Sequence, residues 1–288
     1  ITFCKKIFSQ NIKMASSLLI NRPNKKYSIE YIIKFLENHH AQHLETIKNI
    51  LNVLNIELDT KFHEYGVKIS PIDYEFLPIK IKKGFYKIGT NKSFVYDNEK
   101  PENQIKVNSY EISKNYITIQ NWVAFIEDGG YKNDKYWTKK SWDWLKKNNI
   151  NSPYNWKFNN YTLSLSSHLG YVVPFGKMPV SNISWYEIKA FSNWKKLKIA
   201  HEIQWEIASK KIFNKYQVWE WCNNKFYAYP GYKPFPYEEY SKPWFNNNYF
   251  TLKGGSALTD SIIKRKTFRN FYKPSTRYIC SGGRLSKF

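Results

Sequence analysis

The chain has 288 residues, 18% of them aromatic, which is enough for one large or two ordinary domains and excludes a largely disordered protein. No apolar run approaches the length of a membrane span, and the first twenty residues lack the apolar core of a signal peptide, so we expect a cytoplasmic protein with no membrane partner. The three cysteines, Cys4, Cys222 and Cys280, are too widely spaced for a disulfide framework or a CxxC metal site.

The net charge of +22 raises the question of nucleic-acid binding. Only five of the 45 basic residues are arginine, however, and the lysines are spread along the chain, so we expect no nucleic-acid partner. The arginines are informative by position, because four fall in the last 24 residues: Arg265, Arg269, Arg277 and Arg284. In a chain that otherwise uses lysine, arginine indicates bidentate or stacked contacts.

Residues 27–56 carry apolar side chains at helical spacing and predict one long helix that begins near Ser28. The periodic positions are Ile32, Leu36, Ile47, Ile50 and Leu54. A single amphipathic helix must bury its apolar stripe against partners, and residues 1–26 are too few to supply a bundle. Because the chain also begins with Ile, we expect residues 1–65 to be the C-terminal part of an incomplete helical domain.

A linker around Gly66 and Pro71 leads into a second region, in which short β-like runs and turns replace the helical spacing. The runs "FLPIKI" and "FYKIGT" predict strands, and turns rich in Gly, Pro and Asn separate the short elements. Helices are predicted at residues 118–127, 139–147 and 184–210. We therefore expect residues 75–288 to form an irregular α+β domain held together by aromatic side chains and loops.

The stretch "LENHHAQHLETI" places three histidines in the predicted long helix. His39 and His43 are four residues apart and lie on one helical face, in the stripe of Leu36 and Ile47 that the helix must bury. Two imidazoles on a buried face each need a polar partner, and one metal ion would satisfy both. Hydrogen bonds to core groups would also satisfy them, so the spacing leaves both interpretations open. His40 points about 100° away and is expected to be solvated.

This helix resembles the H-x3-H-x-E helix of the DinB-like domain in the EgtB family, the sulfoxide synthases of ergothioneine biosynthesis. The resemblance implies that His39 and His43 are ligands of a non-haem iron(II), together with a third histidine from an earlier helix. It also implies that Glu45 is the carboxylate of the motif and that Gln42 contacts a histidine-derived substrate beside the iron.

The second region resembles the formylglycine-generating-enzyme-like, or sulfatase-modifying-factor, domain of the same family, whose fold is C-type-lectin-like. The matching stretches follow the family order: "GFYKIGTNKSFVYDNEKP", "AFIEDGGY", "PVSNISWYEIKAFSNW", "VWEW", "YPGYKPFPYEEYSKPWF", "LKGGS", "FRNFYKP" and "SGGRL". Cys280 stands alone where the sulfatase-activating enzymes use a cysteine pair for copper, which favours the EgtB-like branch. The resemblance covers about residues 30–288 and implies that residues 1–65 are the remnant of a DinB-like domain.

The resemblance also implies the chemistry. In the family, an Fe(II) cofactor brings together O2, hercynine (trimethylhistidine) and a thiol, either cysteine or γ-glutamylcysteine, and oxidation joins the sulfur to the imidazole carbon as a sulfoxide. Neutral imidazole ligands with open coordination positions suit such a reaction. Tyr227, Tyr229 and Tyr272 are candidates for donating a proton or an electron to oxygen, and among 23 tyrosines the sequence alone does not choose. Tyr272 is the catalytic candidate within the substrate-binding segment.

That segment is "FRNFYKP", which the resemblance makes a wall of the substrate site. Asn270 matches the asparagine that helps to hold the imidazole, and Phe271 and Tyr272 stand where some members have Trp and Asp. If that Asp binds the ammonium group of the thiol donor, its absence favours free cysteine as the donor. Arg269 and Arg277 are candidates for bidentate contact with a substrate carboxylate. A second set of charged residues is expected to be structural: Glu206, Glu220 and Arg284.

The third histidine ligand has no counterpart, because no histidine precedes His39. His63, His168 and His201 do not occupy the expected place. Two interpretations follow: the chain is an N-terminally incomplete copy of a synthase, or it has lost the metal and kept the fold as a non-catalytic relative. Another oxidase of the formylglycine-generating-enzyme superfamily is the alternative enzyme.

Overall fold

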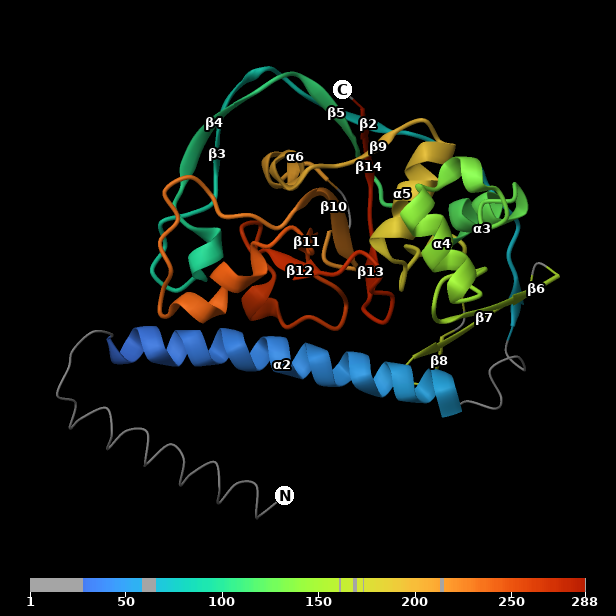
Figure 1. Cartoon of the computed structure of the whole chain (residues 1–288), viewed down its shortest axis with the longest axis horizontal. Helices are drawn as coiled ribbons and strands as arrows, with labels where there is room; N and C mark the ends of the chain where they lie inside the picture. The colour runs from blue at the N-terminus through green and yellow to red at the C-terminus, as the bar shows by residue number, and fades with distance from the viewer. Residues whose placement is uncertain are drawn as a thin grey trace, which may run out of the picture.

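The computed structural model describes residues 28–58, 66–160, 162–167, 170–172, 174–212 and 215–287. Helix α2 (Ile29–Leu58) runs along one side of a domain of mixed helices and sheets (Figure 1). The hydroxyl of Ser28 accepts a hydrogen bond from the backbone N–H of Tyr31 (3.1 Å) and so caps the helix. The predicted helix over residues 27–56 is confirmed, displaced by two residues at each end. No helix in the described part of the chain has the length and apolar character needed to span a membrane.

One sheet has the strand order β12-β11-β10-β13. Its strands are β10 (Trp219–Lys225), β11 (Phe250–Gly254), β12 (Asn270–Tyr272) and β13 (Ser281–Gly282). β10 and β13 are parallel and the other pairs are antiparallel. The register pairs Leu252 with Asn270 and Phe250 with Tyr272, so the segment predicted to bind substrate is the edge strand of this sheet.

The remaining strands form two further sheets and a hairpin. The order β2-β5-β14-β9 joins β2 (Pro78–Ile81), β5 (Tyr110–Ser113), β14 (Leu285–Lys287) and β9 (Lys198–Ile199). A second sheet contains β1 (Val67–Lys68), β6 (Trp156–Asn159), β7 (Thr162–Ser167) and β8 (Gly170–Val172). The hairpin pairs β3 (Gly84–Ile88) with β4 (Asn103–Val107). The strands predicted from "FLPIKI" and "FYKIGT" are confirmed as β2 and β3.

Four short helices pack around the sheets (Figure 1): α3 (Ile119–Glu127), α4 (Lys139–Lys147), α5 (Trp185–Trp194) and α6 (Glu202–Ala208). Single 3-10 turns lie at η1 (Asp97–Glu99), η2 (Asp134–Tyr136), η3 (Glu238–Tyr240), η4 (Lys242–Trp244) and η5 (Ser261–Ile263). The single helix predicted over residues 184–210 is wrong. Lys196 adopts a left-handed conformation (φ 54°) that ends α5, and the chain then forms β9 before α6 begins.

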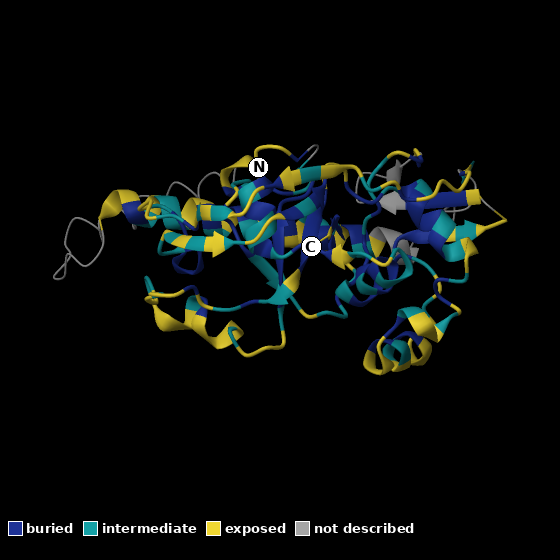
Figure 2. Ribbon diagram, turned by 90° about the horizontal axis from the view of Figure 1, so that it is seen from above, coloured by how far each residue is buried: buried dark blue, intermediate teal, exposed yellow. Residues whose placement is uncertain are grey.

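Aromatic side chains and buried ion pairs hold the domain together. Trp122 stacks on Phe191, with the ring centroids 5.0 Å apart, and both belong to the main core cluster. Figure 2 shows the buried residues in dark blue. Each of the four C-terminal arginines approaches one carboxylate through both Nε and Nη2; the pairs are Arg265 with Glu99, Arg269 with Glu202, Arg277 with Glu187, and Arg284 with Glu220. The expectation that arginine marks bidentate geometry is confirmed, and Glu220 and Arg284 are structural as predicted. Glu206 is buried against Lys253.

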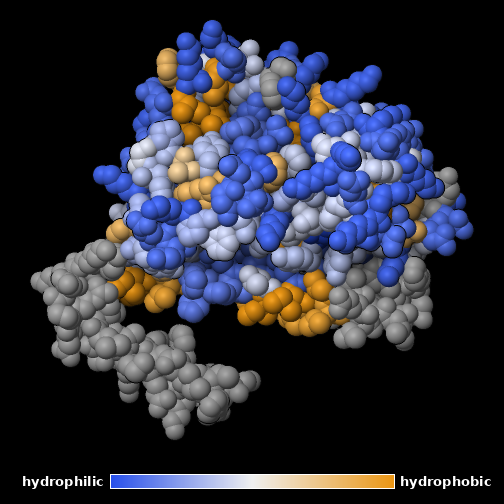
Figure 3. Space-filling view, viewed as in Figure 1, coloured by the Kyte–Doolittle hydropathy of each residue, from blue (hydrophilic) through white to orange (hydrophobic). Residues whose placement is uncertain are grey.

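Helix α2 does not bury the face that its sequence predicts. Its buried positions are mostly polar: Tyr31, Asn38, Ala41, Glu45, Asn49 and Asn52. Its apolar stripe is exposed and gathers along the edge that α2 forms in Figure 3; it consists of Ile29, Ile33, Leu36, Leu44, Ile47, Ile50, Leu51 and Leu54. The expectation that Leu36 and Ile47 are buried beside the histidines is therefore wrong. Hydrogen bonds attach this helix to the domain, and the histidines lie at the boundary between its two faces.

Candidate functional site

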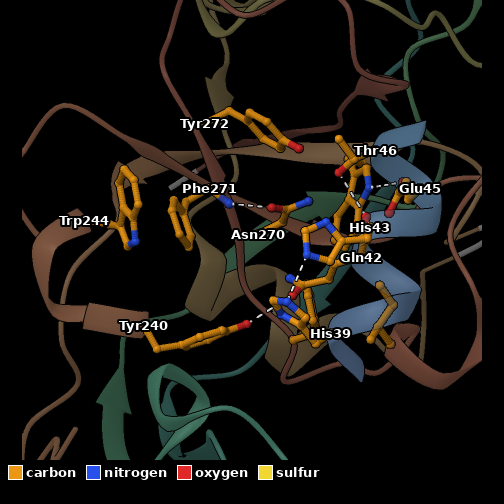
Figure 4. A pocket seen from close by; sticks show the side chains of 13 residues that line it. His39, Gln42, His43, Glu45, Thr46, Tyr240, Trp244, Asn270, Phe271 and Tyr272 are labelled. Carbon is orange, nitrogen blue, oxygen red and sulfur yellow. Dashed lines mark hydrogen bonds between the residues drawn. The ribbon is translucent and has the colours of Figure 1, made fainter. Parts of the chain in front are cut away.

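The imidazoles of His39 and His43 approach each other on α2 (Figure 4). Their Nε2 atoms are 2.9 Å apart, joined by a hydrogen bond in which one imidazole donates to the other, and the rings are nearly perpendicular, at 85°. Two nitrogens that each bind one metal at about 2.1 Å with a right angle between them lie about 3 Å apart, so the pair has the separation of adjacent ligands. Burial, followed by the charges of His43 and His40, lowers the pKa of His39, which favours the neutral imidazole that a metal requires.

The histidine pair opens into a pocket of about 430 Å³ between α2, the η3–η4 turns and β12 (Figure 4). Its lining residues are His39, Gln42, His43, Glu45, Thr46, Trp219, Tyr240, Trp244, Ile263, Phe268, Asn270, Phe271 and Tyr272. Six residues predicted from sequence to bind metal or substrate thus meet in one place: His39, Gln42, His43, Asn270, Phe271 and Tyr272. The three residues on α2 and the three on β12 are more than 220 positions apart in the sequence, and the docking of α2 on the domain brings the two groups together.

Gln42 is held in one orientation by two tyrosines. Its Oε1 accepts hydrogen bonds from the hydroxyls of Tyr96 (3.0 Å) and Tyr240 (3.1 Å). Burial raises the pKa of Tyr96 to about 12, so its hydroxyl remains a donor at neutral pH. Asn270 is oriented similarly, because its Oδ1 accepts the backbone N–H of Phe271 (2.9 Å). Both carbonyl oxygens are used within the protein, which leaves the two amide NH2 groups as donors toward the pocket.

Aromatic rings form the wall of the pocket that faces the amides. Trp244 and Phe271 lie against each other with ring centroids 5.8 Å apart, and Tyr240 and Tyr272 extend the wall on either side (Figure 4). The pKa of Tyr272 is raised by burial and then by the charge of Glu45, so its hydroxyl keeps its proton at neutral pH. An aromatic wall beside amide donors and an imidazole pair suits a ligand that combines a cation with hydrogen-bond acceptors.

Glu45 joins α2 to the domain. One of its oxygens, Oε1, accepts hydrogen bonds from Trp219 Nε1 (2.8 Å), Ser256 Oγ (2.8 Å) and Thr259 Oγ1 (2.6 Å). Glu45 is two residues from His43 and is buried, so these bonds fix the helix on which the imidazoles stand. Sequence reasoning identified the carboxylate of the motif but not these partners.

Sequence reasoning also missed Tyr240 and Trp244 as site residues. Both belong to the quoted "YPGYKPFPYEEYSKPWF" stretch, and the signal was its density of aromatic residues between prolines. The candidate tyrosines Tyr227 and Tyr229 do not line the pocket and lie instead over the guanidinium of Arg269.

Two arginines predicted to bind substrate do not line the histidine pocket and are each paired with a carboxylate of the domain, which corrects that prediction for this pocket. The side chain of Arg269 is fully buried, and it donates to Glu202, to the carbonyl oxygen of Asn98 and to that of Tyr227. Arg277 donates to Glu187 and to the carbonyl oxygen of Ser152. The guanidinium of Arg269 needs these acceptors because a buried charge must be neutralised by nearby groups.

A third metal ligand is not found in the described part of the chain, where no group of three His, Cys, Asp or Glu side chains could hold a metal ion. His63 and His168 lie outside the described residues. His201 has another role: its Nδ1 accepts the backbone N–H of Ile203 (3.2 Å) and caps α6. Among the described residues, His39 and His43 can therefore supply two of the three histidine ligands that an iron site of this type requires.

Comparison with known proteins supports the resemblance. Residues 77–217 match the family described as Sulfatase-modifying factor enzyme 1-like domain. The chain is 26% identical over 236 residues to "Hercynine oxygenase" of Mycobacterium tuberculosis, which covers 66% of this chain and 55% of that protein. It is 26% identical over 240 residues to "Hercynine oxygenase" of Mycolicibacterium smegmatis, with the same two coverages. Among solved structures, "Structure of PvdO from Pseudomonas aeruginosa" matches with a TM-score of 0.49 and 13% identity, covering 73% of this chain and 93% of that chain.

The chain spans about half the length of the curated relatives that it matches. The family match falls on the domain that follows α2, and the match to hercynine oxygenases extends over two thirds of the chain. The chain therefore carries a sulfatase-modifying factor enzyme 1-like domain and is EgtB-like, as its motifs predicted.

Proposed function

We propose that this protein is, or is part of, an iron(II)- and O2-dependent sulfoxide synthase that joins the sulfur of a thiol to the imidazole of hercynine. The observation that carries the proposal is the 2.9 Å separation of His39 Nε2 and His43 Nε2 at the mouth of a pocket that also holds Gln42 and Asn270. In this proposal residues 1–65 belong to a DinB-like domain, residues 75–288 form the second domain, and the protein acts in the cytoplasm.

The two imidazoles would hold the iron, whose chemistry when bound is the four-electron use of O2, one oxygen atom going to the sulfoxide and the other to water. The chain's own residues bind and orient the substrates. The amide NH2 groups of Gln42 and Asn270 would donate to the imidazole or carboxylate of hercynine, and the faces of Trp244 and Phe271 would receive its trimethylammonium group. Tyr272 would supply the proton on its hydroxyl to an oxygen atom formed at the site.

The metal proposal is tested by anaerobic titration of the chain with Fe(II), and with Co(II) as a spectroscopic probe. We expect one metal ion per chain, lost or weakened at least tenfold in His39→Ala and in His43→Ala. His40→Ala is the matched control, because this histidine lies on the same helix and does not line the pocket. Equal metal binding by the wild type and both ligand variants would contradict the proposal.

The substrate proposal is tested by titrating hercynine and histidine against the same protein. Because the two differ only in the three methyl groups, preference for hercynine measures the contribution of the aromatic wall. We expect Trp244→Ala to weaken hercynine binding about tenfold while changing histidine binding little, since a desolvated cation on an indole face contributes about 1–2 kcal/mol. Hercynine binding without any metal binding would favour the non-catalytic relative.

A further inference from the structure

Two buried carboxylates differ from the others in the described part of the chain, because no arginine or lysine forms an ion pair with them. Seven of the described acidic residues are buried, and five of these are glutamates paired with arginine or lysine. The other two are Glu45 and Asp97, which accept hydrogen bonds from neutral donors. A buried carboxylate without a counter-charge depends on such donors, so the segments that carry the donors are held in place.

The carboxylate of Asp97 holds one loop at two points. Asp97 lies in η1 and is 1% exposed. Its Oδ1 accepts a hydrogen bond from the hydroxyl of Ser241 (2.5 Å), and its Oδ2 accepts from the hydroxyl of Tyr232 (2.7 Å) and the backbone N–H of Phe235 (3.3 Å). All three donors belong to the loop between β10 and β11, so one side chain fixes this loop on the rest of the domain.

The loop held by Asp97 carries two walls of the histidine pocket. Tyr240 directly precedes Ser241, lines the pocket, and donates a hydrogen bond to Gln42 (Figure 4). Trp244 also lines the pocket, and its backbone N–H donates to the carbonyl oxygen of Ser241 (3.1 Å), so the position of Trp244 follows that of Ser241. Asp97 itself does not line the pocket and acts on it only through the loop.

The position of this loop matters most for a cationic ligand. A cation is attracted to an aromatic face only within about 6 Å of the ring centroid, so a small displacement of Trp244 removes most of that attraction. The two imidazoles stand on α2 and the amide of Asn270 on β12, outside the loop. Gln42 keeps a second donor, Tyr96, that does not belong to the loop either. Loosening of the loop should therefore weaken recognition of a trimethylammonium group and spare the rest of the site.

We propose that Asp97 is a positioning residue that sets ligand selectivity: its carboxylate fixes the loop between β10 and β11, and the loop fixes Trp244 relative to the histidine pair. The inference rests on the proposed function, because the trimethylammonium ligand named there reports on the position of Trp244. Asp97 contributes no atom to the pocket, and its effect passes through Ser241. It complements Glu45, which fixes the helix on which the imidazoles stand.

The test is calorimetric titration of the full chain with hercynine and with histidine. Asp97→Asn replaces one acceptor oxygen by an NH2 group and so disrupts the contacts with the loop. We expect hercynine to bind about tenfold more weakly to this variant, while the Kd values for histidine and Co(II) stay within about twofold of the wild type. Ser241→Ala removes only the contact nearest to Trp244. It should have the same effect, and it replaces Asp97→Asn if that variant does not fold.

Asp128→Asn is the matched control. Oδ2 of Asp128 accepts hydrogen bonds from Trp194 Nε1 (2.6 Å) and from the hydroxyl of Tyr136 (3.4 Å), and none of the three residues lines the pocket. This variant should bind both ligands like the wild type. A double-mutant cycle supplies the readout that a general loss of structure would not give: in the Trp244→Ala background, Asp97→Asn should weaken hercynine binding no further.

Hydrogen exchange tests the anchoring of the loop without any ligand. We expect exchange over residues 232–245 to accelerate at least tenfold in Asp97→Asn, while α2 and β12 exchange as in the wild type. Unchanged exchange in the loop would overturn the inference. Equal weakening of hercynine and histidine binding would do the same, as would additive effects of Asp97→Asn and Trp244→Ala.

These outcomes are separate from failure of the proposed function. If the wild type prefers hercynine and Asp97→Asn keeps that preference, only the role of Asp97 falls. If the wild type binds neither hercynine nor histidine, the proposed function falls, and the selectivity role of Asp97 falls with it even where exchange shows that Asp97 holds the loop.

Discussion

Helix α2 turns mostly polar residues toward the domain and its apolar residues outward, whereas the domain buries its aromatic side chains and pairs five buried glutamates with arginine or lysine. Across the interface between them, α2 relies on a few polar contacts: Asn38 with Arg265 (2.7 Å), Gln42 with Tyr96 and Tyr240, and Glu45 with Trp219, Ser256 and Thr259. The domain is organised by burial, and the helix is placed by these hydrogen bonds together with ring contacts near its N-terminus, of Tyr31 with Phe235 and of Phe35 with Tyr240.

This difference locates the site. Polar groups on the inner face of α2 leave room for a pocket that a close-packed apolar interface would fill. The imidazoles come from the helix, and the aromatic wall and one amide come from the domain, so neither region alone contains the proposed site. Mutations in the domain, at the interface and on the outer face of α2 should therefore change the free energy of unfolding by different amounts.

The largest effect is expected in the domain. Arg284→Met should destabilise the protein by about 3–5 kcal/mol, because it leaves the buried carboxylate of Glu220 without its partner. Urea unfolding measures the change. The double variant Arg284→Met with Glu220→Leu should recover most of the loss. Lys242→Ala breaks an exposed ion pair with Glu238 and should cost less than about 0.5 kcal/mol. Similar losses of stability in Arg284→Met and Lys242→Ala would contradict the expected difference between buried and exposed pairs.

The second largest loss of stability is expected from a change at the interface between α2 and the domain. Glu45→Ala removes the acceptor of Trp219 Nε1 and of two hydroxyls, only one of which can then donate to the other, and should cost about 2–3 kcal/mol. Because the loss is at the interface, hydrogen exchange should accelerate in α2 while the domain strands stay protected. Glu37→Ala, at an exposed position of the same helix, is the control. Uniform acceleration over the whole chain would mean that the helix and the domain unfold as one unit.

A smaller effect concerns pH. Burial lowers the pKa of His201 from its ordinary value of 6.5. The charge of Glu202 opposes this shift, and the charge of Arg269 adds to it. The folded protein therefore binds this proton less readily than the unfolded chain, and stability that is complete above pH 6.5 is lost as the pH falls through the folded pKa. His201→Asn keeps an acceptor at the N-cap and should flatten this dependence, whereas His201→Ala should cost about 1 kcal/mol at neutral pH. An unchanged pH dependence in His201→Asn would assign the loss to another group.

The smallest effect is expected on the outer face of α2. Ile47→Gln should change stability by no more than about 0.5 kcal/mol, because this side chain is 54% exposed. Thermal unfolding at several protein concentrations measures it. A loss of more than about 2 kcal/mol would show that the apolar stripe is covered in solution.

Much of the fold followed from local sequence patterns. Helical spacing predicted α2, the runs "FLPIKI" and "FYKIGT" predicted β2 and β3, and the scarcity of arginine predicted bidentate pairs. These features depend on neighbours in the chain or on residue chemistry. The break between α5 and α6 was missed because it depends on the left-handed conformation of Lys196 and on the pairing of β9 with β14, which is a tertiary contact.

The candidate site was predictable where residues act as a motif. His39, Gln42 and His43 lie on one turn of helix, and Asn270 to Tyr272 form one strand. Arg269 was misplaced because it directly precedes β12 and its guanidinium pairs with the buried Glu202, a tertiary contact, whereas the next residue, Asn270, reaches the pocket. Tyr240 and Trp244 were missed because 3-10 turns carry no periodic signal.

The pairing of the C-terminal arginines has a consequence for synthesis of the chain. Their partners Glu99, Glu187, Glu202 and Glu220 leave the ribosome 64 to 166 residues earlier. Until the last stretch emerges, four carboxylates destined for the interior have no counter-charge, and the domain cannot close around them. Folding of this domain must therefore wait until residues 265–288 have left the ribosome, and a nascent chain that stops before residue 265 should remain protease-sensitive.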